Sequence, residues 1–234
     1  VVTVGGVDIA ASVGVADTAC VVAGLGLAAG EGFVAVGSGS QTVSLIDTPL
    51  LDPTLRTHTF AVAGDPRAGW YRIGAVQSAG LTLTAALAWF DATVEEAAAS
   101  LAQGVQATDP IFVPYLSGER TPFMVSSLRG SWVGLSLATD RQAMLRSVLE
   151  GVAQAVALGV SAVQESGAPL AEPVPLVGGG THDPAFRQLL ADASGVALTV
   201  TEAPDAAVVG AALLGAGLTT NPVPPAHTVQ VDPR

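Results

Sequence analysis

The chain has 234 residues, enough for one large α/β domain or two small ones with a substantial buried core. Half of the residues are hydrophobic and 12% are charged, a composition that excludes intrinsic disorder and indicates a globular protein. The formal charge of −11, from 20 acidic residues and 9 arginines, disfavours binding to nucleic acid and to anionic membrane surfaces.

Cysteine content and hydropathy predict a cytoplasmic protein without a membrane span. The single cysteine, Cys20, allows neither an internal disulfide nor a cysteine metal site, which fits a reducing compartment. The longest uncharged stretch, residues 73–90, carries polar side chains and lacks the apolar density of a membrane helix. The chain opens at Val1, directly on an apolar run and without a leader, so we expect that it is cut from a longer protein.

The first third of the chain predicts mainly antiparallel strands. Residues 1–4 are a β-branched run, Gly5-Gly6 is a turn, and the alanine-rich stretch after Asp8 is a short helix. Apolar residues then alternate from Gly32 to Ile46 around a glycine-serine cluster, which predicts a hairpin. Two more runs are predicted strands: residues 57–62 and 70–76.

The rest of the chain predicts helices alternating with short strands. Two helices are expected between residues 78 and 103, followed by a proline-bounded loop from 109 to 130. Residues 139–142 have capping-box form and begin a long helix that ends near Gly167. Its apolar face is marked by Leu145, Val148, Val152, Val156, Val160 and Val163. The remaining predicted elements are strands 175–177 and 197–201, helices at about 184–193 and 205–216, and a tail after residue 219.

Three small-residue turns follow predicted strands and are candidates for phosphate binding. They are Gly5-Gly6-Val7-Asp8, Gly37-Ser38-Gly39-Ser40 and Gly178-Gly179-Gly180-Thr181. Turns without large side chains let backbone amides approach phosphate oxygens closely. In a chain with 27 glycines, however, a glycine pair at a turn is most often only a turn. No lysine is present, which excludes a Walker-type phosphate loop.

Single side chains leave the chemistry open. Asp8 can serve as a general base or as a plain helix N-cap, and Ser38 as a phosphate ligand or an ordinary turn residue. Glu119-Arg120 favours a structural ion pair in its loop over a substrate contact. The three histidines are too far apart in sequence for metal or relay spacing, and no serine lies in a nucleophile elbow. We therefore assign no metal ligand.

The segment PYLSGERTP, residues 114–122, resembles the FGGY carbohydrate kinases, and its form is most similar to their xylulokinase branch. Further segments resemble the family's motifs in the correct order: residues 129–137, 146–153, 177–180 with 187–192, and 206–215. The resemblance implies an α/β fold of the actin-like, ribonuclease-H-like ATPase type, with a mixed sheet flanked by helices. It also implies that this chain is the C-terminal part of a two-domain kinase.

The resemblance assigns roles to the glycine turns. It makes Asp8 the catalytic base that deprotonates a sugar hydroxyl, and it makes Gly37, Ser38 and Gly39 the phosphate-contacting turn of an ATP site. Gly80 then lies beside the nucleotide. The turn formed by Gly178, Gly179 and Gly180 lies under the adenosine. Mg²⁺ is expected to be held mainly by the nucleotide and the missing domain.

The resemblance predicts three parts and a reaction. Residues 1–22 end the sugar-side domain, residues 23–218 form the nucleotide-side domain, and residues 219–234 are a tail. The expected reaction is phosphorylation of D-xylulose to D-xylulose 5-phosphate. Another sugar or polyol kinase (gluconate, ribulose or glycerol type) and a non-catalytic fragment are the alternatives. The expected partners are a ketopentose and the missing N-terminal domain, without which activity should be lost; a homodimer is compatible with the resemblance.

Overall fold

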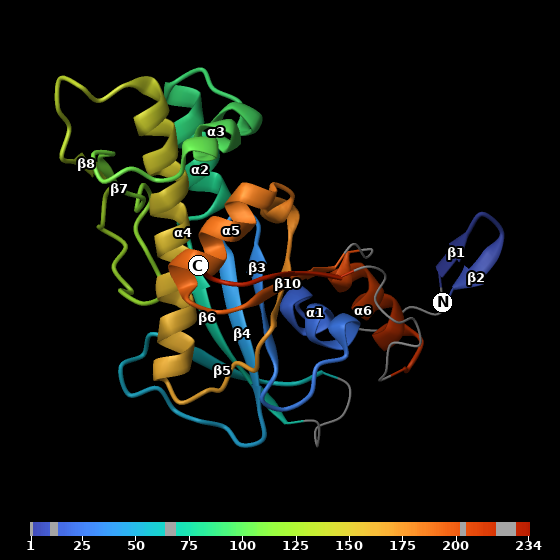
Figure 1. Cartoon of the computed structure of the whole chain (residues 1–234). Coiled ribbons are helices and arrows are strands. Elements are labelled where there is room, and N and C mark those ends of the chain that lie inside the picture. The colour runs from blue at the N-terminus through green and yellow to red at the C-terminus, as the bar shows by residue number, and fades with distance from the viewer. Residues whose placement is uncertain (1, 10–13, 64–68, 202–204, 219–227) are drawn as a thin grey trace.

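The computed structural model describes residues 2–9, 14–63, 69–201, 205–218 and 228–234. Its centre is a seven-stranded sheet in the order β11-β10-β9-β3-β4-β6-β5 (Figure 1). These strands are β3 (Gly32–Val36), β4 (Ser40–Ile46), β5 (His58–Ala61), β6 (Trp70–Val76), β9 (Val174–Val177), β10 (Leu198–Thr201) and β11 (Thr228–Val231). β9 is parallel to both of its neighbours and the other pairs are antiparallel, so the sheet is mixed as predicted.

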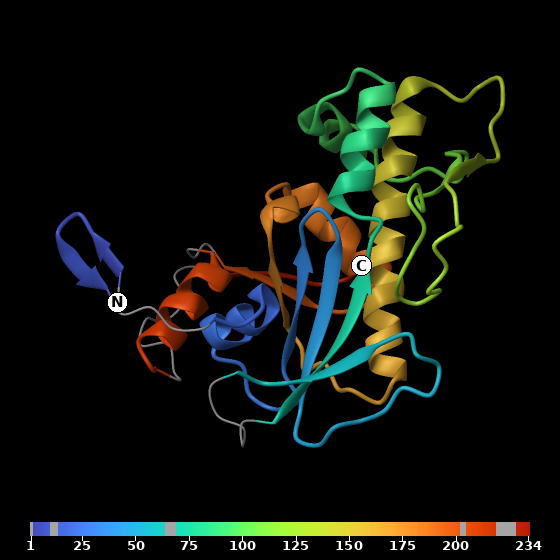
Figure 2. The same cartoon turned by 180° about the vertical axis from the view of Figure 1, so that it is seen from behind.

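Helices cover both faces of this sheet. The described helices are α1 (Asp17–Leu25), α2 (Gly80–Trp89), α3 (Val94–Ser100), α4 (Arg141–Glu165), α5 (Pro184–Ser194) and α6 (Ala206–Gly215). α4 and α5 pack on the face that carries Val34 and Leu176. α1 packs on the opposite face, over Phe33 and Val43, and α6 lies against α1 (Figure 2). Successive apolar residues of β3 therefore point into two hydrophobic cores, one on each face of the sheet.

The long helix α4 is the backbone of the larger core. All six residues of its predicted apolar face are at most 2% exposed. Its N-cap is Asp140, whose carboxylate accepts the amide of Ala143 at 2.7 Å, so the predicted capping box over 139–142 is wrong by one residue. Among the described helices α4 alone is long and apolar enough to span a membrane, but 78% of its apolar window is buried in the fold.

The predicted strand and the Gly5-Gly6 turn at the start of the chain are confirmed over residues 2–6, whereas the segment around Asp8 differs from the prediction. β1 (Val2–Val4) and β2 (Val7–Ile9) form an antiparallel hairpin. Gly5 and Gly6 have φ of +56° and +80°, the left-handed pair that a tight two-residue turn requires. The helix predicted after Asp8 is therefore absent as far as Ile9, and residues 10–13 lie outside the described residues. The hairpin stands apart from the sheet in both views (Figures 1 and 2).

Most of the other predicted elements are confirmed. The hairpin over 32–46 exists as β3 and β4, and Glu95 and Glu96 lie in the first turn of α3 as expected. Three features were not predicted from the sequence. They are α1, the small hairpin of β7 (Ile111–Val113) and β8 (Ser131–Val133) within and just after the predicted loop, and β11, an edge strand within the predicted tail.

α1 and α6 pack closely against each other at two glycines, Gly24 and Gly210. A Cβ on Gly24 would lie 2.0 Å from the carbonyl oxygen of Ala206, and a Cβ on Gly210 would lie 1.7 Å from that of Cys20. The helices approach closely because neither glycine has a side chain. The predicted domain boundary between residues 22 and 23 falls inside α1, and it stays a prediction.

A buried polar network holds the loop that leaves β4. Asp52, 6% exposed, accepts the amides of Thr54, Arg56 and Thr57 at 3.0, 3.2 and 3.0 Å, together with the hydroxyls of both threonines. The guanidinium of Arg72, 1% exposed, donates to the Thr57 hydroxyl at 3.0 Å. Burial by itself would raise the pKa of Asp52, but the hydrogen bonds outweigh it and lower that pKa to about 2.

We expect Asp52→Asn to lower the free energy of unfolding by about 2 kcal/mol at pH 7, because the pKa of Asp52 falls from 3.8 to about 2 on folding. This contribution is complete above the unfolded pKa and is lost as the pH falls from about 4 to about 2. Urea unfolding of both proteins across this pH range measures it. Equal stability of the two proteins at pH 7 would contradict the prediction.

Candidate functional site

Two of the three predicted phosphate turns lie next to each other at one end of the sheet. β3 and β9 are adjacent and parallel, with Val34 opposite Leu176 and Ala35 opposite Val177. Gly37 directly follows β3, and Gly178 directly follows β9. Because the carboxyl ends of neighbouring parallel strands lie at the same end of the sheet, the two glycine turns lie side by side.

The N-terminus of α2 rests on the first of these turns. The amides of Gly80 and Leu81 donate to the carbonyl oxygens of Gly37 and Ser38, both at 2.9 Å. A Cβ on Gly80 would lie 2.4 Å from the Gly37 oxygen, so only glycine permits this contact. A Cβ on Gly39 would similarly lie 2.7 Å from the carbonyl oxygen of Val76. Gly37, Gly39 and Gly80 are thus brought together by backbone packing.

The second turn packs against β3 through two of its three glycines. Gly178 has φ +101°, and a Cβ there would lie 2.5 Å from the Val36 carbonyl oxygen. A Cβ on Gly180 would lie 2.9 Å from the Val36 side chain. Gly179 has nothing within 4 Å of its Cβ position, and all three glycines are exposed. Gly179 therefore faces open space at this end of the sheet.

This arrangement fits an anionic ligand. Ser38 is exposed beside the N-terminal end of α2, whose N-cap residue, Ala79, supplies no side-chain hydrogen bond. The dipole of α2 makes this end favourable for negative charge, while its first two amides hold the glycine turn by donating to the Gly37 and Ser38 oxygens. At Gly37 and Gly179, where a Cβ would have no atom closer than 3.8 Å, the absence of a side chain leaves room for a ligand to approach the backbone.

The structure does not bring Asp8 to this site. Asp8 lies on β2, where it is exposed and accepts a hydrogen bond from the Thr3 hydroxyl at 2.7 Å. The hairpin that carries it stands away from the end of β3 in both views (Figures 1 and 2). Its role as a base remains a prediction.

The predicted ion pair between Glu119 and Arg120 is wrong. Glu119 is 3% exposed, whereas Arg120 is exposed, and both belong to the described part of the chain, which holds no salt bridge between them. The carboxylate of Glu119 accepts backbone amides instead, including that of Gln77 at 2.6 Å. The sequence signal for a buried carboxylate was present, but its partners lie about forty residues away.

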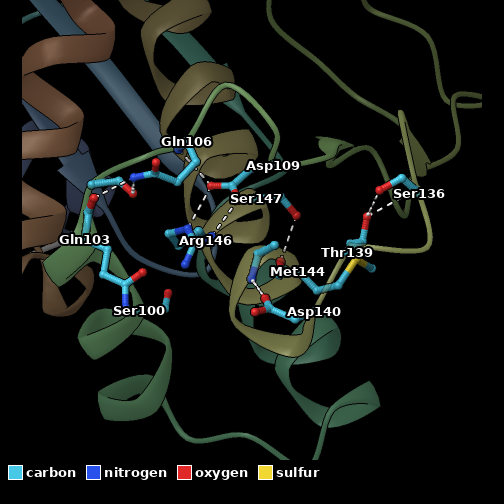
Figure 3. Close-up of polar contacts among 12 residues, drawn as sticks. Ser100, Gln103, Gln106, Asp109, Ser136, Thr139, Asp140, Met144, Arg146 and Ser147 are labelled. Carbon is cyan, nitrogen blue, oxygen red and sulfur yellow. Dashed lines mark hydrogen bonds and ion pairs between the residues drawn. The ribbon is translucent and has the colours of Figure 1, made fainter.

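A buried ion pair joins Arg146 on α4 to Asp109 in the loop before β7 (Figure 3). Arg146 Nε and Nη2 donate to the two carboxylate oxygens of Asp109 at 2.7 and 2.6 Å, and the side chains are 7% and 2% exposed. The hydrogen bond from Arg146 lowers the pKa of Asp109. This pair fastens α4 to the loop before β7, away from the glycine turns, so it has an architectural role.

The described residues offer no metal centre of protein ligands. They contain no group of three or more His, Cys, Asp and Glu side chains that could hold a metal ion. His58 lies on β5 and His182 follows the second glycine turn, while His227 lies outside the described residues. Cys20 is buried in α1.

Comparison with known proteins identifies the family. Residues 34–218 match the C-terminal domain of the FGGY family of carbohydrate kinases, and the chain belongs to this family. It is 30% identical over 211 residues to the xylulose kinase of Bacillus subtilis (strain 168). The matched segment covers 87% of this chain and 41% of that protein. The chain thus spans less than half the length of this relative.

Solved structures agree with this assignment. A crystal structure of a xylulose kinase from Brucella ovis superposes with a TM-score of 0.81 at 30% identity, covering 93% of this chain and 46% of that one. A Plasmodium falciparum glycerol kinase solved with ADP has a TM-score of 0.72 at 24% identity, covering 85% and 40%. The predicted fold class, that of the C-terminal domain of a two-domain sugar kinase, is therefore confirmed.

We expect Arg146→Met to lower the free energy of unfolding by about 3–5 kcal/mol, because it leaves the Asp109 carboxylate buried without its partner. The double variant Arg146→Met with Asp109→Asn should lose less, since no unpaired charge remains and the amide oxygen can still accept the Gln106 amide. Urea titrations of the three proteins measure the difference. A double variant less stable than the single one would contradict this account.

Proposed function

We propose that this chain is the nucleotide-binding part of an ATP-dependent sugar kinase, with D-xylulose as the sugar and D-xylulose 5-phosphate as the product. The observation that carries the proposal is the pair of glycine turns at one end of the sheet, the first packed against the N-terminus of α2 and the second against Val36 of β3. Membership of the FGGY family supports the reaction class. The name of the Bacillus subtilis relative supports the choice of sugar.

In this proposal the two turns divide the nucleotide between them. The turn of Gly37, Ser38 and Gly39 presents the Ser38 and Gly39 amides and the Ser38 hydroxyl to the phosphates, while the Gly37 amide closes the turn by donating to the Gly39 oxygen at 2.8 Å. Gly179 provides a flat surface for the adenosine. The ADP bound to the Plasmodium falciparum glycerol kinase supports a nucleotide in this fold. Mg²⁺ would neutralise charge on the phosphates, held by them and by the part of the relatives that this chain does not span.

The remaining length of the relatives would supply the other half of the site. Phosphoryl transfer depends on positioning and on charge stabilisation, so we expect this chain alone to have little activity. Together with the rest of a two-domain kinase, Asp8 would take the proton from the sugar hydroxyl that attacks the γ-phosphate. A cytoplasmic location stays a prediction from the sequence. The alternatives are a kinase for another sugar and a non-catalytic nucleotide-binding domain.

We expect Gly179→Val to weaken binding of Mg-ATP at least about tenfold, because the added side chain occupies the open space proposed for the adenosine. Gly215→Val is the matched control, since Gly215 on α6 is also exposed with nothing within 4 Å of its Cβ position. Isothermal titration calorimetry of the three proteins measures the affinities. If Gly179→Val binds Mg-ATP as tightly as the unchanged chain, the second turn is not part of the site.

We expect Asp8→Asn to lower kcat about 100-fold or more, while leaving Mg-ATP affinity nearly unchanged, once this chain is joined to an N-terminal domain from a xylulose kinase. The physical reason is that an amide cannot accept the hydroxyl proton. ADP release with D-xylulose, D-ribulose, gluconate and glycerol, followed in the same coupled assay, measures kcat and decides between the sugars. A near-normal kcat would exclude Asp8 as the base.

A further inference from the structure

The buried carboxylate of Glu119 lies close to the first glycine turn and is bound only to backbone amides in the described contacts. Its Oε1 accepts the amides of Gln77 at 2.6 Å and of Arg120 at 2.7 Å, and its Oε2 accepts the amide of Ser78 at 3.2 Å. The side chain is 3% exposed. Such burial is costly for a charge unless its hydrogen bonds compensate, so this carboxylate is held in one place.

The loop around Glu119 is itself fastened to the sheet. Thr121 and Ala75 exchange hydrogen bonds at 2.9 Å, from the Thr121 amide to the Ala75 oxygen and from the Ala75 amide to the Thr121 hydroxyl. Gly118, with φ +83°, would bring a Cβ within 2.5 Å of the Ser126 carbonyl oxygen, so the turn before Glu119 requires glycine. The carboxylate is therefore presented by a rigid support at the end of β6.

Two of the three amides that Glu119 binds belong to the short connection between β6 and α2. β6 ends at Val76 and α2 begins at Gly80, so one residue, Ala79, separates the bound Ser78 amide from the helix. The Ala79 amide donates to the Gln77 oxygen at 3.2 Å, and the first two amides of α2, of Gly80 and Leu81, donate to the Gly37 and Ser38 carbonyl oxygens. A continuous series of hydrogen bonds thus runs from Glu119 through this connection to the glycine turn.

We propose that Glu119 is a positioning residue for the nucleotide site: it fixes the β6–α2 connection, and through it the Gly37–Gly39 turn that receives the phosphates. This inference rests on the proposed function, and it adds a residue that contacts the connection rather than the ligand. A carboxylate suits the role because it only accepts hydrogen bonds, whereas a glutamine amide would turn an N–H₂ group toward one of the amide donors.

The test compares two isosteric variants with the same local chemistry. Glu119→Gln alters a buried carboxylate that accepts three amides beside the glycine turns. Asp52→Asn alters a buried carboxylate that also accepts three amides, but at the opposite end of the sheet. Both should lose stability. Calorimetry with Mg-ATP at pH 7, at a temperature where both variants are fully folded, should show about tenfold weaker binding for Glu119→Gln and unchanged binding for Asp52→Asn.

A second measurement does not depend on the nucleotide. Hydrogen exchange of the Gly80 and Leu81 amides, followed by nuclear magnetic resonance without ligand, should be at least about tenfold faster in Glu119→Gln than in Asp52→Asn. If the unchanged chain fails to bind Mg-ATP, the proposed function fails, and the exchange rates alone decide the positioning role. Unchanged exchange of these two amides would overturn it, as would an equal loss of Mg-ATP affinity in both variants.

If Glu119→Gln does not fold, Glu119→Asp replaces it. Aspartate keeps the charge and shortens the side chain by one methylene, so it should still bind part of the connection. We expect exchange at Gly80 and Leu81 to be faster than in the unchanged chain, with a correspondingly smaller loss of Mg-ATP affinity. Exchange and affinity equal to those of the unchanged chain would overturn the proposal.

Discussion

The backbone contact between Gly37 and Gly80 is the constraint on which the proposed site depends. The Gly80 amide donates to the Gly37 oxygen at 2.9 Å, and a Cβ on Gly80 would approach that oxygen to 2.4 Å. A larger residue would push α2 away from the end of β3. The same exclusion of side chains places Gly178 against Val36. The glycine turns and the N-terminus of α2 therefore lie together at this end of the sheet because their backbones pack without Cβ atoms between them.

Two buried carboxylates support opposite ends of this sheet by the same means. Asp52 binds the amides of the loop after β4, and Glu119 binds those of the connection after β6. β4 and β6 are antiparallel, with Ser40 opposite Val76, so these loops lie at different ends. Each carboxylate satisfies several amides in an irregular segment that has no strand or helix partners. The two ends differ in what they support, a closed loop at one and an exposed glycine turn at the other.

Family membership and the position of Asp8 together define what this chain contributes. The chain belongs to the FGGY carbohydrate kinases but spans 41% of the length of the Bacillus subtilis relative. Asp8 lies on an exposed hairpin, and a two-stranded hairpin is at best marginally stable in water without further packing. Under the proposed function, contacts with the rest of a two-domain kinase would supply that packing. The two glycine turns at the ends of β3 and β9 need no such addition, because this chain's own sheet and helices position them.

The sequence by itself determined the local elements and the family. Apolar alternation over 32–46 and helical spacing through α4 are short-range patterns, and the segment 114–122 carries a specific resemblance. Only the tertiary structure decided that the two glycine turns adjoin, because the pairing of β3 with β9 joins segments far apart in the chain. It also decided that Glu119 binds backbone amides, two of them distant, instead of the guanidinium of its neighbour Arg120, and that Asp8 lies in a hairpin. Burial and pairing between distant segments override local pattern, and no local pattern encodes them.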